Sequence, residues 1–239
     1  MKSGVRRAVS AAAVVAALGG TTGCWAISGG GDAGKPAKSA TPAASAKSAA
    51  PKALTAAELD KAVLAAGDVR GYKVEKPAKA DLPPALSVPA NPASCQPLAD
   101  MFMFSTQPAA KARVVRTLLG TDQFDPRVTS LALLAHDAAD AAKVMRDVRT
   151  ASQNCTAYEH ADYKYSGVKA RPAPDAGDEA VSYDVRGVID GDRIPMTFTV
   201  VRSGSTVVAF YTMNMLDPKK TDVPAAIVDA QIAKLEKTG

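Results

Sequence analysis

The sequence predicts an α+β domain in which helices cover an antiparallel sheet, and three observations lead to it. Segments with apolar residues at helical spacing occur together with runs rich in Val, Thr, Phe and Tyr, which favour strands. The last three runs are separated by Asp190-Gly191 and Ser203-Gly204, and such pairs favour tight turns because glycine tolerates a positive φ. The part of the chain from residue 54 onward is long enough for a single core.

A secretory signal peptide is predicted at the N-terminus. Three positive charges within the first seven residues precede an uncharged run from Ala8 to Gly20, which is the order of such a peptide. The run is far shorter than the ~20 apolar residues that a transmembrane helix needs. We therefore expect residues 1–23 to be removed during export.

The residues around the expected cleavage point resemble a lipobox. Thr21-Thr22-Gly23-Cys24 is similar to the lipobox of bacterial lipoproteins at Gly23 and Cys24, and departs from it at Thr21, where Leu is usual. The resemblance implies that the Cys24 thiol is acylated and anchors the protein to the extracytoplasmic face of the cell membrane. The alternative is an ordinary signal peptidase cut nearby, which leaves Cys24 as a spare thiol.

Cysteine usage bears on the same question, because an exported protein with three cysteines has one that needs an explanation. If Cys24 carries the lipid, Cys95 and Cys155 remain as one pair in a compartment where disulfides persist. The alternative is that Cys95 and Cys155 are two buried thiols that never meet.

The positive charge of the chain lies outside its predicted domain. Residues 28–52 are nearly all Gly, Ala, Ser, Thr, Pro and Lys, so 24–53 is expected to be a lipidated N-terminus followed by a disordered linker. The linker lysines are placed to lie against an anionic membrane surface. Residues 54–239 hold 22 Lys and Arg against 23 Asp and Glu, a net charge of −1. This balance argues against a nucleic-acid partner.

Four helices are expected. Thr55 and Glu58 form a capping box at the start of the first, which Gly67 can close. The second runs from Asp137, as N-cap, to about Ser152. The third follows Asp222 and has Pro224 in its first turn, and a shorter helix starts after Pro92 and carries Cys95, Leu98, Met101 and Phe102.

Five strands are expected, at 112–119, 128–135, 180–189, 194–202 and 206–215. Within the third of them Val181, Tyr183 and Val185 alternate with Ser182 and Asp184, so that one face is buried and the other is wet. The last three strands form a C-terminal meander, and the connections between them are short enough for hairpins.

Several pieces between Leu54 and Glu236 occur in a recognisable order. They are the turn at 64–72 that ends the opening helix, Cys95 before a helix, Cys155 at the end of the next helix, and the segments at 177–180 and 200–204 that border the last strands. In this order they resemble the PknH-type extracellular sensor domain of actinobacterial receptor-like serine/threonine kinases and free-standing lipoproteins.

The resemblance implies a curved antiparallel sheet, packed by three to four helices, that bounds a ligand-receiving cleft without catalysis. The chain departs from the kinase domain in having one cysteine pair where that domain has two, and in lacking a cytoplasmic kinase, so signalling does not carry over. A second resemblance is to the PsbP-like fold of other mycobacterial-type lipoproteins, which also implies binding.

Catalytic and metal-binding patterns are scarce, so we expect no enzyme, cofactor or metal. The two histidines, His136 at a strand-to-helix junction and His160 in a loop, lack metal-ligand spacing and are interpreted as solvated or capping residues. The alternative is a hydrolase with a dispersed triad. Asp175, Asp178 and Glu179, with Asp190 and Asp192 nearby, are interpreted as a solvated turn in which Asp178 accepts backbone N–H groups.

The predicted ligand site rests on surplus apolar side chains. The run 101–104 places four large apolar residues in succession, which one helix cannot turn toward one core, so either some of them line a groove or the run is a buried strand. The expected ligand is a small molecule, a lipid or an envelope protein, and the alternatives are that these residues are core or form a flat protein-docking surface. The candidate residues are Met101, Phe102, Phe104, Phe210, Tyr211 and Met213.

Overall fold

The computed structural model describes residues 52–78, 82, 86–122, 124, 126–189 and 191–238. The predicted signal peptide, the lipid attachment at Cys24 and nearly all of the predicted linker lie outside the described residues, so they remain predictions. In the part that is described, no helix has the length and apolar character of a membrane span.

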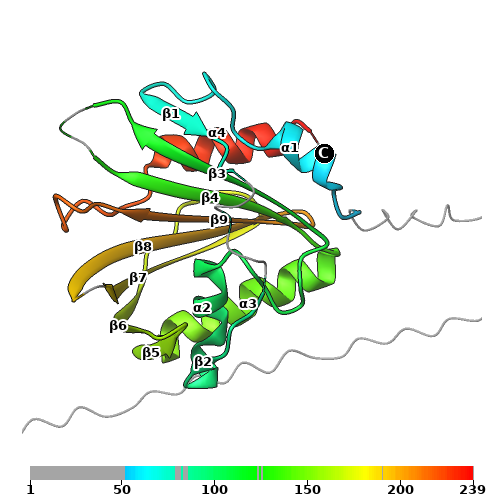
Figure 1. The fold of residues 1–239 in the computed structure, drawn as a ribbon. Coiled ribbons are helices and arrows are strands. Elements are labelled where there is room, and N and C mark those ends of the chain that lie inside the picture. Colours follow the sequence, from blue (N-terminus) through cyan, green and yellow to red (C-terminus); the bar gives the residue numbers. More distant parts are fainter. Residues whose placement is uncertain are drawn as a thin grey trace, which may run out of the picture. The chain divides into compact units, whose positions relative to one another are not determined.

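A nine-stranded antiparallel sheet forms the centre of the domain, in the order β1-β3-β4-β9-β8-β7-β6-β5-β2 (Figure 1). It is open, with β1 and β2 at its edges, and it curves around one pair of helices. The predicted meander is present as β7-β8-β9. The strands are β1 (Tyr72–Glu75), β2 (Ala90–Asn91), β3 (Ala112–Gly120), β4 (Val128–Ala135), β5 (Ala157–His160), β6 (Tyr163–Arg171), β7 (Glu179–Ile189), β8 (Asp192–Ser203) and β9 (Thr206–Met213).

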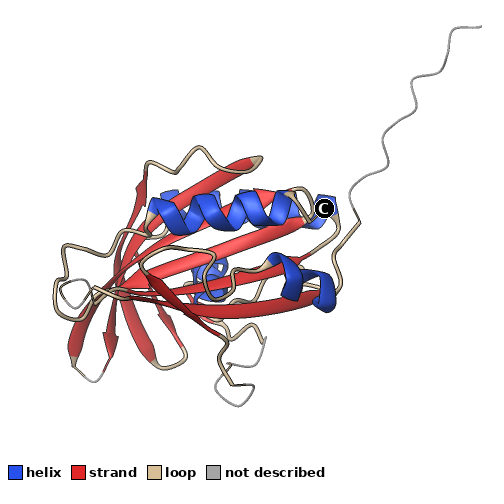
Figure 2. Cartoon of the chain, turned by 90° about the horizontal axis from the view of Figure 1, so that it is seen from above, coloured by secondary structure: helices blue, strands red, loops and turns tan. Residues whose placement is uncertain are grey.

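Helices cover both faces of the sheet. On one face α2, which follows a short 3₁₀ turn η2, packs against the longer α3; on the other face lie α1 and α4 (Figures 1 and 2). The predicted α+β class, with four helices on a curved antiparallel sheet, is therefore confirmed. The bounds are α1 (Ala56–Ala62), η2 (Ala93–Cys95), α2 (Gln96–Phe102), α3 (Ala138–Asn154) and α4 (Ala225–Glu236).

Strand alternation divides the apolar residues between two cores. On β9, Val207 and Ala209 face α2 and α3, whereas Val208 and Phe210 face α1 and α4. Because successive side chains of a strand point to opposite faces, each central strand contributes to both cores. Among the described residues, those of the two cores come from Ala53 onward, so the fragment from Lys52 contains both of these cores.

The first helix is shorter than predicted. Its capping box is present, since the Thr55 hydroxyl accepts a hydrogen bond from the Glu58 N–H while the Glu58 carboxylate accepts one from the Thr55 N–H at 2.7 Å. The helix nevertheless ends at Ala62 and not at Gly67. The reason is a tertiary contact, because the Leu64 N–H donates to the Gln231 side chain on α4 instead of continuing the helix.

The segment around His160, which was predicted to be a loop, forms the hairpin β5-β6. His160 ends β5 and is 2% exposed, so its assignment to a loop was wrong. His136 is also buried, at 1% exposed, and the interpretation of both as solvated or capping residues was wrong. The turn uses Ala161 and Asp162 with φ of 50° and 66°, a conformation that alanine seldom adopts, so the residue pair does not signal a turn.

The acidic residues before and within β7 bind arginines. Asp178 accepts the Gly204 N–H at 2.8 Å, as predicted, and also the Arg202 guanidinium at 2.7 Å. Glu179 lies half-buried between Arg202 and Arg149, at 2.8 and 2.9 Å, so its interpretation as part of a solvated turn was wrong. Burial acts to raise the pKa of the Glu179 carboxyl, but the two guanidinium groups lower it below its usual value.

Candidate ligand-binding site

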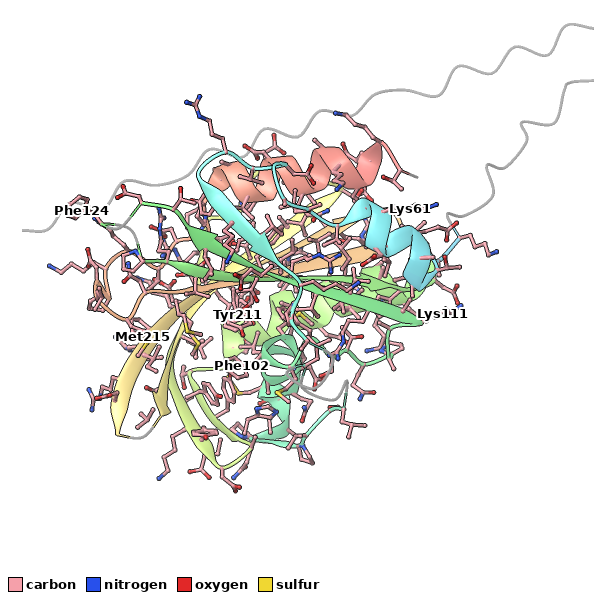
Figure 3. The ribbon with its side chains drawn as sticks, turned by 45° about the horizontal axis from the view of Figure 1, so that its top comes forward. Lys61, Phe102, Lys111, Phe124, Tyr211 and Met215 are labelled. Carbon is pink, nitrogen blue, oxygen red and sulfur yellow. A yellow bond between two sulfur atoms is a disulfide. The ribbon has the colours of Figure 1, made fainter. Side chains whose placement is uncertain are left out.

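Aromatic side chains from α2 and β9 meet on the sheet face that α2 and α3 cover, which we call the aromatic face. The rings of Phe102 and Tyr211 are stacked with centroids 5.5 Å apart, and the ring of Phe104 lies 5.5 Å from that of Tyr211 (Figure 3). Phe102, Tyr211 and Met213 pack against the core but stay partly exposed. Large apolar side chains of this face are therefore left accessible beside α2.

A disulfide positions α2 on this face. Cys95, at the end of η2, is bonded to Cys155, which follows α3, and their Cα atoms lie 5.5 Å apart. The predicted pairing is confirmed, and the alternative of two separate thiols was wrong. Because the bond joins the start of α2 to the end of α3, it limits how far Phe102 can move from Tyr211.

A buried carboxylate also holds α2 in place. Asp100 is 2% exposed and accepts hydrogen bonds from the Ser87 hydroxyl at 2.7 Å and from the Gln96 amide at 2.9 Å. The Ser105 hydroxyl donates to the backbone oxygen of Asp100 at 3.2 Å. These bonds connect α2 to the segments before and after it, so the helix that carries Phe102 is fixed at both ends.

The six predicted residues fall into three places. Phe102, Phe104, Tyr211 and Met213 lie together on the aromatic face. Met101 is buried and lines a cavity of about 200 Å³ between α2 and α3. Phe210 is fully buried in the core under α1 and α4, so it cannot contact a ligand on the aromatic face.

The run that contains Met101 and Phe102 is not a strand. Helix α2 continues to Phe102, and the chain then turns through Met103 to Phe104, whose φ is 50°. The alternative of a buried strand at 101–104 was therefore wrong. The turn brings Phe104 back toward the sheet, which explains how Phe102 and Phe104 both reach Tyr211.

Four further aromatic residues of this face were not among the residues predicted from the sequence. Tyr183 and Phe198 stack with centroids 4.9 Å apart, and Phe198 lies 5.2 Å from Tyr211. Tyr158 and Tyr165, from the missed hairpin, stack at 4.8 Å. The alternation in β7 did mark Tyr183 as buried, but nothing in the sequence indicates that these rings join Tyr211 in one cluster.

The aromatic face also contains buried polar atoms without protein partners. Among the described residues, nothing hydrogen-bonds the hydroxyl of Tyr183 or either ring nitrogen of His160. Burial raises the pKa of the Tyr183 hydroxyl well above its usual value and lowers the pKa of His160, against the opposing charge of Asp100. Burial therefore favours the neutral form of both side chains, and their polar atoms have no hydrogen-bond partner among the described residues.

The hydrolase alternative has no geometric support in the described part of the chain. His136 Nε2 lies 3.4 Å from the Thr106 hydroxyl, both residues are buried, and desolvation lowers the pKa of the imidazole. No serine with an acid completes a triad at either histidine among the contacts of these residues. The described residues also form no group of His, Cys, Asp and Glu that would hold a metal ion.

Neither the family models nor the curated proteins compared with this chain match it. Several solved structures match the chain. The chain is similar to the extracellular domain of PknH from Mycobacterium tuberculosis, with a TM-score of 0.48 and 11% identity over 78% of this chain and 97% of that one. The PknH-type domain, which the order of sequence pieces resembles, is thus among the similar structures.

Two other mycobacterial structures are similar at lower scores. One is a putative uncharacterized protein of Mycobacterium smegmatis, the Rv0999 ortholog, with a TM-score of 0.36 and 14% identity over 79% of this chain and 96% of that one. The other is LpqN, involved in cell envelope biogenesis of M. tuberculosis, with a TM-score of 0.24 and 18% identity over 41% of this chain and 57% of that one.

Proposed function

We propose that the chain is an extracytoplasmic lipoprotein whose domain binds, without catalysis, a small molecule or lipid that has an apolar body. The ligand lies against Phe102, Tyr211 and Met213 on the aromatic face. Anchoring at Cys24 and the linker behind it hold the domain on the outer side of the cell membrane.

One observation carries the proposal. Three large apolar side chains that pack against the core under α2 and α3, those of Phe102, Tyr211 and Met213, stay partly exposed. Full burial of a side chain of this size is favourable by about 1.5–3 kcal/mol, so a ligand that covers the exposed part of these three would gain a fraction of that for each. Tyr183 and His160, buried beside Phe198 and Tyr165, have polar atoms without a hydrogen-bond partner among the described residues.

Photocrosslinking tests where the ligand binds. Palmitic acid that carries a diazirine is added to the fragment from Lys52, and the labelled peptides are identified by mass spectrometry. We expect labelling on the peptides that contain Phe102 and Tyr211, and competition by unmodified palmitic acid. The combined substitution Phe102→Ser and Tyr211→Ser is expected to reduce the labelling at least tenfold.

The matched control is Phe124→Ser, because Phe124 is 80% exposed at the far end of β3 and does not belong to the aromatic face (Figure 3). This variant should label as the wild type does. Labelling that spreads evenly over the surface, or that falls on α1 and α4, would contradict the proposed site. A protein-docking surface would instead show no saturable labelling by palmitic acid.

A further inference from the structure

Two pockets lie on the sheet face opposite the aromatic face, away from the proposed site for the apolar ligand. The segment 214–221, between β9 and α4, borders two adjacent pockets of about 280 Å³ each, and both are lined by Pro195 and Pro218. We call the two pockets together the 214–221 groove. Strands β6, β7 and β8 supply the rest of its walls.

The groove is cationic although the domain is not. Its walls include two acidic residues, Asp184 and Asp192, and five basic ones, a net charge of +3, whereas residues 54–239 together carry −1. Asp184 is already engaged, because it pairs with Arg171 at 3.0 Å. The five basic residues are Lys169, Arg171, Arg186, Arg193 and Lys219.

Most of this charge has no acidic partner in the described part of the chain. Arg171 pairs with both Asp184 and Asp222. Within the described ranges, none of the other four basic side chains has a carboxylate within 4.0 Å. Like charges that share a groove repel one another, so their gathering without counterions favours the binding of an anion.

The guanidinium of Arg186 lies close to a glycine. Strand β6 has a bulge between Ser166 and Lys169, and Gly167 in this bulge has a φ of +63°. A Cβ atom on Gly167 would lie 2.2 Å from the Arg186 Nη2 atom. Glycine at this position therefore leaves room for the guanidinium to lie against the backbone of the bulge.

An unpartnered donor lines the other pocket. Asn214 is 1% exposed, and its Oδ1 atom accepts the N–H groups of Leu216 and Asp217 at 3.0 and 2.8 Å, which sets the orientation of the amide. Its Nδ2 atom is buried and has no acceptor among the described residues. A buried N–H donor needs an acceptor, and a ligand in this pocket could supply one.

We propose that the 214–221 groove binds a phosphate group, with Arg186 and Lys219 supplying charge and Asn214 supplying a hydrogen bond. Guanidinium groups suit this ligand because their N–H groups match two phosphate oxygens at once. The phosphate belongs either to a free anion or to a lipid headgroup. The headgroup source is relevant because Met215 and Leu216, 62% and 79% exposed, border the groove and would contact acyl chains.

Thermal unfolding of the full-length chain in a non-ionic detergent, at constant ionic strength, tests this proposal. The probes are inorganic phosphate and glycerophosphoglycerol, the deacylated headgroup of phosphatidylglycerol, with chloride as the reference anion. At least one probe is expected to raise the melting temperature saturably, and the probe with the lower apparent Kd identifies the source.

Two variants and one control make the assignment specific. The combined substitution Arg186→Gln and Lys219→Gln, and separately Asn214→Asp, should each weaken binding at least tenfold; Asn214→Asp keeps an acceptor for Leu216 and Asp217. The control, Lys61→Gln with Arg146→Gln, removes the same charge from α1 and α3 and should change the Kd less than twofold. No saturable shift with either probe, or an equal loss in the control, would overturn the proposal.

Discussion

Replacing Cys95 and Cys155 with alanine is expected to lower the free energy of unfolding by roughly 4 kcal/mol, because the bond closes a loop of 60 residues in the unfolded chain. The stabilisation comes mainly from the smaller number of conformations that the cross-linked unfolded chain can adopt. Urea unfolding of the fragment from Lys52, followed by circular dichroism, measures the change.

Reduction of the wild-type fragment is the control for this experiment, since it breaks the same bond without deleting either sulfur atom. Reduced wild-type protein and the double alanine variant should unfold at about the same urea concentration. The double variant should also lose ligand labelling on the peptide with Phe102, because α2 is no longer tied to α3. A decrease below about 1 kcal/mol would mean that other contacts fix α2, and it would contradict this reading of the bond.

Cys24→Ala is expected to abolish both acylation and membrane association. Cells grown with a clickable fatty acid should produce a labelled wild-type chain in the membrane fraction and an unlabelled variant. The expectation follows from the charged start, the short apolar run and the Gly23-Cys24 junction. A Ser10→Ala variant, which changes a small residue in the uncharged run and leaves Cys24 in place, should be labelled as the wild type is.

Two results would contradict the anchor. Equal labelling of the wild type and Cys24→Ala would place the lipid elsewhere, and a wild-type chain found only in the culture medium would indicate an ordinary signal peptidase cut. The second result would leave the domain extracytoplasmic but free, and it would leave the proposed ligand site unchanged.

Elements with regular patterns were predictable from the sequence. Strands β3, β4, β7, β8 and β9 lie within a few residues of their predicted ranges, because each is a long run of β-branched or aromatic residues next to a recognisable turn. Helix α3 was also predictable, since its apolar residues recur at helical spacing behind Asp137. Helix α4 begins at Ala225, after Pro224, two positions later than expected.

The remaining strands could not be found from local patterns. Strand β2 has two residues and β1 has four, which is too short for alternation to be visible. The β5-β6 hairpin turns through Ala161 and Asp162 at positive φ, where a turn-forming glycine or asparagine would have revealed it. Strands β1 and β2 are held by pairing with partners distant in the sequence, β3 and β5 respectively, so their conformation depends on tertiary contacts.

The candidate site was predicted in part, and the position of Phe210 could have been predicted correctly. Tyr211 and Met213 share a face because they are two residues apart on β9, and the same alternation places Phe210 on the opposite face. The contact of Phe102 with Tyr211 was not predictable in detail, because it joins residues more than 100 positions apart through the packing of α2. The buried position of Asn214 and the cationic groove could not be predicted, because no local sequence pattern indicates either of them.

The most direct test of the aromatic face as a ligand site is tryptophan fluorescence at Phe102. The fragment from Lys52 contains no tryptophan, because the chain has one and it is Trp25. In the variant Phe102→Trp, palmitic acid should shift the emission to shorter wavelength in a saturable manner, because the ligand excludes water from the indole. The variant Phe124→Trp should not respond. No saturable shift at Phe102→Trp, or an equal shift in both variants, would contradict the account.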